Sequence, residues 1–213
     1  MAEHSLVEVA SLSTDFTVLD CAWMPSSPKL LTVGSTLAGQ GVLAVHSLSG
    51  AGLQEVARGG GGKALRCATF SSGTARLLAT GDFQGRLDIW NPESLQAPVE
   101  GVVAHDELVN SIAEAGEGHR LVTGARDGRM RVWDSRKLAR SVASMEGEPD
   151  GRSHDCWAVT CSKSGDVVVG GFSNGDVRMW DLRNTKVHIH IHTGVLISKN
   201  ENTFVTVKTG EKV

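Results

Sequence analysis

The chain has 213 residues, which is enough for one domain or two small ones. Hydrophobic residues make up 40% and charged residues 21%, as in ordinary globular proteins, and the formal net charge of −3 argues against a general binder of nucleic acid or of anionic membranes. The 25 glycines and the many short β-branched runs favour a turn-rich, all-β chain.

Four predicted hairpins follow one another along the chain. Each has an aliphatic run, a glycine-containing turn and an alternating run that ends on Trp or His. The four are KLLTVGSTLAGQGVLAVHS at 29–47, LLATGDFQGRLDIWN at 77–91, RLVTGARDGRMRVWD at 120–134 and DVVVGGFSNGDVRMWD at 166–181. Trp90, Trp133 and Trp180 are 43 and 47 residues apart, and His46 takes the Trp position 44 residues before Trp90.

A further short strand is predicted before each hairpin. We expect these strands at 19–23, 65–70, 109–112 and 157–161, and the polar stretch after each hairpin leaves room for a fourth strand. Four short strands in a repeat of about 40–45 residues are typical of a propeller blade. The sequence therefore predicts a propeller built from such units.

The third unit resembles the repeat of the WD-repeat family and carries all of the family's marks. His105 precedes the first strand, Thr123 lies on the second strand, Asp127 in the turn and Trp133 on the third strand. The resemblance implies a WD-repeat β-propeller in which these four side chains form a hydrogen-bonded structural tetrad. The order suits their chemistry, because the carboxylate accepts from imidazole and the hydroxyl links imidazole to the indole N–H.

The other units depart from this set. In the second unit Thr80 and Trp90 remain, but Gln84 replaces the Asp of the turn. In the fourth unit Asn174 lies in the turn and Gly170 takes the place of Thr. Because a partial polar network satisfies fewer buried groups, we expect these blades to depend more on apolar packing.

Longer strings resemble one branch of the WD-repeat family, the Monad-like assembly factors of axonemal dynein. The strings are TVLDCAW at 17–23, LATGDFQGRLDIWN at 78–91, AHDELVNSI at 104–112, DCWAV at 155–159 and GFSNGDVRMWDLRN at 171–184. The resemblance implies a non-catalytic protein–protein scaffold in the cytoplasm, associated with a prefoldin-like co-chaperone complex through an RNA-polymerase-II-associated protein. Its implied partners are co-chaperone subunits and axonemal dynein chains, with no cofactor, no nucleic acid and no membrane.

The predicted domain organisation follows from this resemblance. Residues 1–184 are predicted to form WD-repeat blades, with units near 17–48, 65–91, 101–136 and 154–183. Residues 185–213 match the family less well and are predicted to be a divergent tail that holds a truncated fifth blade. The expected fold is thus an incomplete propeller of about four blades where the family has about seven. A fragment, a splice variant and a faulty gene model would each explain this.

A second functional hypothesis rests on two Trp-Asp-x-Arg endings. Asp134 with Arg136, and Asp181 with Arg183, match the ending of WD-repeat substrate receptors of cullin-4 ubiquitin ligases. The resemblance implies that the Arg contacts the ligase adaptor, so these four residues are the candidate partner-binding positions. The alternative is a local surface ion pair, which contributes little to stability.

A glycine run could suggest a phosphate site. Gly59–Gly62 precede Lys63, but Ala57 and Ala64 stand where a P-loop requires Gly and Ser or Thr. We therefore interpret the run as a flexible loop between blades.

Three alternating histidines could suggest a metal site. On a strand, His188, His190 and His192 would project from one face, as in a zinc or copper site. No carboxylate or Cys lies close by in the sequence, so we predict no metal. The chain also lacks the motif of a nucleophile elbow, a zinc protease or a kinase, and we predict no catalytic residue and no enzyme.

The four cysteines predict a reducing compartment. Cys21, Cys67, Cys156 and Cys161 form no Cys-x-x-Cys pair, which disfavours disulfides and zinc. The start MAEHSLVEVA lacks the basic and apolar segments of a secretory signal, and no run approaches the roughly 18 apolar residues of a membrane span. We therefore expect a cytoplasmic protein.

Overall fold

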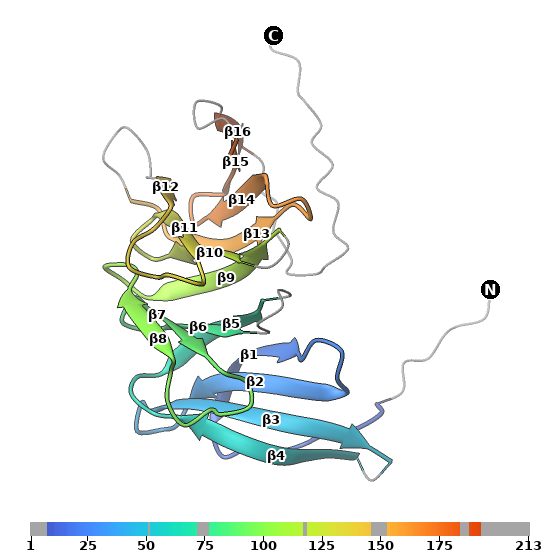
Figure 1. Cartoon of the computed structure of the whole chain (residues 1–213). Coiled ribbons are helices and arrows are strands. Elements are labelled where there is room, and N and C mark those ends of the chain that lie inside the picture. The colour runs from blue at the N-terminus through green and yellow to red at the C-terminus, as the bar shows by residue number, and fades with distance from the viewer. Residues whose placement is uncertain are drawn as a thin grey trace, which may run out of the picture.

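Alternating apolar residues and glycine-rich turns make the chain fold into consecutive antiparallel strands. The computed structural model describes residues 8–50, 52–71, 77–116, 119–145 and 153–183, together with the strand at 188–192. Within these ranges four sheets of four strands each follow one another along the chain (Figure 1). The predictions of an all-β chain and of four blade-like units are confirmed.

The strands of each sheet are neighbours in chain order. Their bounds are β1 (Thr17–Trp23), β2 (Lys29–Ser35), β3 (Gly41–Ser49), β4 (Gly52–Gly60), β5 (Leu65–Phe70), β6 (Leu78–Asp82), β7 (Arg86–Trp90), β8 (Glu100–Val103), β9 (Val109–Ala115), β10 (Arg120–Ala125), β11 (Met130–Asp134), β12 (Ala143–Met145), β13 (Cys156–Cys161), β14 (Val167–Phe172), β15 (Asp176–Asp181) and β16 (His188–His192). The first sheet is β1–β4, the second β5–β8, the third β9–β12 and the fourth β13–β16.

A tight turn joins the second and third strands of every sheet. Gly39, Gly85, Gly128 and Gly175 lie in these turns with φ between 76° and 87°, a region that glycine enters at low cost. The turns set the same register in all four sheets, with the pairs Leu30–His46, Leu78–Trp90, Leu121–Trp133 and Val168–Trp180. His46 and the three Trp residues therefore occupy equivalent positions.

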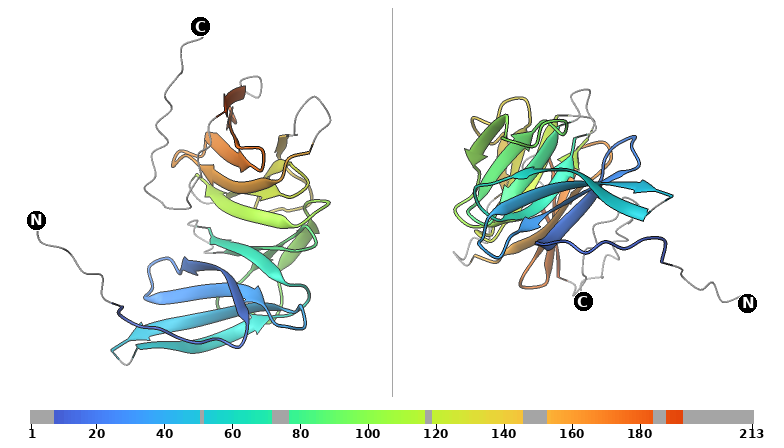
Figure 2. Two further views of the ribbon diagram at one scale, coloured as in Figure 1. Left: turned by 180° about the vertical axis from the view of Figure 1, so that it is seen from behind. Right: turned by 90° about the horizontal axis from the view of Figure 1, so that it is seen from below.

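The four sheets fan out from a common inner edge. The first strands β1, β5, β9 and β13 lie next to one another in that order, with contacts between each neighbouring pair. The outer strands β4, β8, β12 and β16 lie at the periphery (Figure 1), and the order of the sheets is equally clear from behind (Figure 2). The arrangement is that of consecutive propeller blades.

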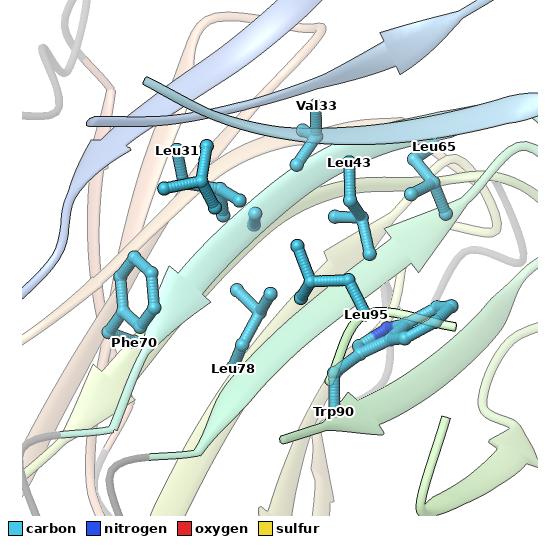
Figure 3. Close-up of a cluster of buried hydrophobic side chains, with 10 residues drawn as sticks. Leu31, Val33, Leu43, Leu65, Phe70, Leu78, Trp90 and Leu95 are labelled. Atoms are coloured by element: carbon cyan, nitrogen blue, oxygen red, sulfur yellow. The ribbon is translucent and has the colours of Figure 1, made fainter. Parts of the chain in front are cut away.

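The apolar core lies between successive sheets. The first cluster combines Leu31, Val33, Leu43 and Val45 of the first sheet with Leu65, Ala68, Phe70, Leu78, Trp90 and Leu95 of the second (Figure 3). We call the side of a sheet that carries His46, Trp90, Trp133 or Trp180 its indole face. The opposite side, which carries aliphatic residues of the third strand such as Leu43 and Val45, is its aliphatic face. The indole face of the second sheet thus packs on the aliphatic face of the first.

The same pairing of faces recurs at the next two interfaces. Trp133 clusters with Leu87 and Ile89 of the second sheet. Trp180 clusters with Met130 and Val132 of the third sheet. Burying one large apolar side chain contributes roughly 1.5–3 kcal/mol to folding. Since each interface buries several such side chains, packing between sheets is the main contribution to the stability of the fold.

The indole face of the first sheet is covered by the segment that precedes β1. Phe16 packs there on Val42 and Ala44 in a small separate cluster. The Arg58 guanidinium carbon lies 5.5 Å from the centre of the Phe16 ring, and its Nη2 lies 2.7 Å from Asp15 Oδ1. The segment before β1 therefore takes part of the place that a preceding sheet would occupy.

Two glycines at the end of β4 hold the loop between β7 and β8 against the first sheet. The Gly60 amide donates to the Leu95 carbonyl at 3.0 Å. A Cβ atom on Gly59 would lie 1.9 Å from the same carbonyl oxygen, so only glycine permits this approach. The interpretation of the Gly59–Gly62 run as a flexible loop is therefore wrong for its first two residues, which belong to β4 and join two sheets.

Gly59→Ala should destabilise the chain, because its Cβ would push the Leu95 loop away from β4. We expect a loss of about 1–3 kcal/mol in the free energy of unfolding, measured by urea denaturation. Gly50→Ala is the matched control, since Gly50 has a negative φ and open space around its Cβ position. Equal urea midpoints for the two variants would contradict this account of the contact.

Candidate functional site

The predicted tetrad residues of the third sheet lie in one hydrogen-bonded chain. The indole Nε1–H of Trp133 donates to the Thr123 hydroxyl at 2.9 Å. That hydroxyl lies 2.7 Å from Nε2 of His105, whose Nδ1 lies 3.0 Å from Asp127 Oδ2. His105 and Thr123 are fully buried at 1% and 0% exposure, so water cannot replace these partners.

With a neutral imidazole, the chemistry of the two ends gives the direction of every hydrogen bond in this chain. An indole N–H can only donate and an ionised carboxylate can only accept. Thr123 therefore accepts from Trp133 and donates to Nε2 of His105, and Nδ1–H of His105 donates to Asp127. Each polar group has a partner of the right kind, which is the condition under which a buried polar network stiffens a protein.

Glycine in the turn of the second sheet positions His105. The amides of Ala104 and His105 both donate to the Gly85 carbonyl, at 2.8 and 2.9 Å. A Cβ atom on Gly85 would lie 2.1 Å from the His105 carbonyl oxygen. The tetrad of one sheet thus depends on a turn of the preceding sheet.

Asp127 is the charged end of the tetrad. Burial raises its pKa, but the hydrogen bond from His105, together with those from the amides of Arg129 and Asp106, lowers the pKa below the ordinary 3.8. A carboxyl group whose pKa is lowered by folding stabilises the fold above its unfolded-state pKa. That contribution is lost as the pH falls through the lowered value.

The first two sheets keep one hydrogen bond of the tetrad. Trp90 Nε1 donates to the Thr80 hydroxyl at 2.8 Å in the second sheet. In the first sheet Nε2 of His46 lies 2.8 Å from the Thr32 hydroxyl, so an imidazole nitrogen stands where the other sheets have indole. The bond between the third and second strands is therefore preserved where the rest of the tetrad is missing.

Other side chains take over the turn that Asp127 supports in the third sheet. In the second sheet Asp82, and not Gln84, accepts from the turn, with its Oδ1 2.8 Å from the amides of both Gln84 and Arg86. In the fourth sheet Asn174 Oδ1 accepts from the Asp176 amide at 3.1 Å. Asp82 lies three residues before the turn glycine Gly85, and this short spacing was the sequence signal for the first of these.

The fourth sheet replaces Thr with glycine because a neighbour fills the space. A Cβ atom on Gly170 would lie 2.3 Å from the sulfur of Met130, which belongs to the third sheet. Beside it Arg178 donates to Asp176 at 2.9 Å, with side-chain exposures of 3% and 4%. The Arg178 guanidinium carbon also lies 4.4 Å from the centre of the Phe172 ring. This sheet therefore combines packing with a buried ion pair.

The predicted partner-binding positions form two matching surface pairs. Arg136 contacts Asp134 through Nε at 2.9 Å and Nη2 at 2.6 Å, and Arg183 contacts Asp181 at 3.0 and 2.8 Å. The Arg136 side chain is 63% exposed and that of Arg183 is 67% exposed. The hydrogen bonds from Arg136 lower the pKa of Asp134 to about 2. Both guanidinium groups are thus held in a defined orientation at the surface.

The three alternating histidines lie on the outermost strand of the fourth sheet. His188, His190 and His192 lie on β16, paired with β15, but their side chains are outside the described residues, so the expectation about metal stays a prediction. Elsewhere in the described ranges no group of three or more His, Cys, Asp or Glu side chains is arranged to hold a metal ion. Nor does any helix in the described part have the length and hydropathy needed to cross a membrane.

Two leucines that join neighbouring sheets were not predicted from the sequence. Leu95 and Leu138 each lie five residues after a Trp and are 5% and 1% exposed. Each belongs to the cluster that contains this Trp. The amide of Leu138 also donates to Glu100 of the second sheet at 3.0 Å. The repeated Trp-x4-Leu spacing was the available signal.

Thr123→Val should cost more stability than Thr80→Val. The first substitution removes the partner of both the Trp133 indole N–H and Nε2 of His105, whereas the second removes only that of the Trp90 indole N–H. An unsatisfied buried group costs about 1–3 kcal/mol, so the difference in the free energy of unfolding should be of that size. Urea denaturation of both variants provides the measurement, and an equal or larger loss for Thr80→Val would argue against a cooperative tetrad.

A family model described as "WD domain, G-beta repeat" matches residues 97–134 and 141–181. Each match starts before the outer strand of one sheet and ends on the third strand of the next, so β8 joins β9–β11 and β12 joins β13–β15. The repeat in sequence is therefore offset by one strand from the sheet in space. This offset links each sheet to the following one.

Full-length relatives resemble the chain over most of its length. Dynein axonemal assembly factor 10 of Bos taurus is 39% identical over an alignment of 184 residues that covers 81% of this chain and 52% of that protein. The protein of the same name from Chlamydomonas reinhardtii is 37% identical over an alignment of 194 residues that covers 85% of this chain and 54% of that protein. The chain thus spans about half the length of these relatives.

Solved structures support the fold. "Structure of U3-55K" superposes with a TM-score of 0.69 and 17% sequence identity, covering 85% of this chain and 53% of that one. At this identity the likeness concerns architecture alone. Together with the repeated motifs, the four fanned sheets and the matched repeats, these similarities show that the chain belongs to the WD-repeat family and forms part of a WD-repeat β-propeller.

Proposed function

We propose that the chain is a non-catalytic protein-binding scaffold that acts in the cytoplasmic preassembly of axonemal dynein, together with a prefoldin-like co-chaperone complex. The observation that carries this proposal is the 36–39% identity, over about four fifths of the chain, to animal and algal proteins named dynein axonemal assembly factor 10. The identity extends well beyond the residues that define a WD repeat.

The polar side chains described above make structural contacts, which supports a scaffold function over an enzymatic one. Asp82 and Asp127 accept hydrogen bonds from turn amides, and Asp176 pairs with the buried Arg178. The Cys156 thiol is buried, which raises its pKa. Groups that could serve as acids, bases or nucleophiles therefore hold the sheets in shape.

Affinity purification from ciliating cells tests this function. The tagged chain should recover co-chaperone subunits and axonemal dynein chains, identified by mass spectrometry against an unrelated WD-repeat propeller as control. Recovery of neither class at expression levels where the chain is folded would contradict the proposal.

The exposed Arg136 and Arg183 favour one second candidate, a substrate receptor of a cullin-4 ubiquitin ligase. Their guanidinium groups are oriented by Asp134 and Asp181 and remain more than half exposed, as a docking side chain would need. An arginine that becomes buried at an interface is a frequent hot spot.

The same purification separates the two candidates. Under the scaffold proposal, the double variant Arg136→Ala/Arg183→Ala retains the co-chaperone subunits and dynein chains. Under the ligase alternative, the wild-type chain recovers a cullin-4 adaptor and the double variant loses it. Arg140→Ala is the control, because Arg140 is an exposed arginine in the loop after Leu138.

A further inference from the structure

Every first strand carries a β-bulge at the same place. The register of β1 with β2 skips Leu19, and that of β5 with β6 skips Arg66. The register of β9 with β10 skips Asn110, and that of β13 with β14 skips Trp157. A bulge adds a residue that opposes no partner and turns its side chain away from the regular alternation, and such bulges are often found beside binding sites.

The four bulge residues line one pocket. Leu19, Arg66, Asn110 and Trp157 all contribute to its wall, together with their neighbours on the same strands. The pocket runs across β1, β5, β9 and β13, which form the common inner edge of the fan (Figures 1 and 2). We call it the bulge pocket.

The bulge pocket contains an exposed aromatic platform. Trp157 is 53% exposed, although Trp90, Trp133 and Trp180 are each 6% exposed or less. Asn110 beside it is 5% exposed, and its Nδ2 donates to the Cys156 carbonyl at 3.0 Å. The backbone under Trp157 is therefore fixed, which lowers the entropic cost of packing a ligand on its ring.

The bulge pocket also contains the cationic side chain of Arg66. Arg66 makes one long hydrogen bond, 3.4 Å, to the Leu19 carbonyl, and it forms no ion pair among the described residues. Asp20 lines the same pocket, but its oxygens accept from the amides of Cys21 and Ala68 at 2.9 and 3.0 Å. Two hydrogen bonds of Asp20 are thus to backbone amides, and the Arg66 guanidinium can receive a carboxylate.

We propose that the bulge pocket binds an extended segment of a partner protein that carries an acidic residue beside a large apolar one. The carboxylate pairs with Arg66 and the apolar side chain packs on Trp157. A peptide suits the site, because the four bulge residues follow one another across four strands. Nucleic acid does not, since a phosphate chain is held by several cationic contacts and Arg66 is the one cationic side chain among the residues that line this pocket. The inference rests on the proposed scaffold function and specifies one of its binding surfaces.

Selection from a random peptide library displayed on phage tests this proposal with the whole chain as bait. Enriched peptides should carry Asp or Glu within about three positions of Trp, Phe, Leu or Ile. The affinity of the most enriched peptide, measured by fluorescence anisotropy, should fall about tenfold or more in both Arg66→Ala and Trp157→Ala. Arg66→Lys should retain part of the affinity, because the charge remains.

The controls separate the pocket from other exposed groups. Trp23 is 60% exposed but does not line the bulge pocket, so Trp23→Ala should leave peptide affinity unchanged, as should Arg140→Ala. Urea denaturation verifies that the variants remain folded. Selection without an acidic–apolar motif, or affinities that Arg66→Ala and Trp157→Ala do not change, would overturn the proposal. If the purification still recovers dynein chains in that case, only the surface is wrong; if it does not, the scaffold function fails separately.

Discussion

The packing of each indole face on the aliphatic face of the preceding sheet is the contact on which the rest of the structure depends. A single four-stranded sheet with two apolar faces cannot bury them alone, so it requires a neighbour on each side. Trp90, Trp133 and Trp180 meet the same third-strand positions of the sheet before them. The Leu95 and Leu138 loops, and the offset of the sequence repeat by one strand, reinforce these same interfaces.

Polar contacts vary more from sheet to sheet than this packing does. The third sheet has the whole tetrad, the second keeps Thr80 with Trp90, and the first uses His46 in place of indole. In the fourth sheet, the sulfur of Met130 takes the room of the missing threonine side chain at Gly170. These variations keep the interior filled, although Nδ1 of His46 is buried without a hydrogen-bond partner. The network therefore adds rigidity, where it is complete, to a stack that apolar burial already forms.

The sequence alone predicted the structural features whose residues recur from sheet to sheet, but it did not predict the bulges or the contacts that occur at single places. The hairpins, the Trp register and the grouping of His105, Thr123, Asp127 and Trp133 follow from spacing, because identical geometry demands similar residues. The bulge residues share no chemistry, and a bulge is defined by pairing with another strand, which spacing does not show. The close contact at Gly59 was likewise hidden, since a glycine run looks the same in a flexible loop and in a tight approach.

The packing between sheets repeats, whereas the bulge residues of the first strands differ from sheet to sheet. The result is a rigid stack that presents different side chains at equivalent positions of its inner edge, as a scaffold requires. Hydrogen exchange of the strand amides, followed by mass spectrometry, tests the dependence on stacking most directly. β6 and β10 lie in sheets that pack on a neighbouring sheet at both faces, so their amides should exchange more slowly than those of β2 and β14. Slower exchange in β2 or β14 than in β6 and β10 would contradict the account.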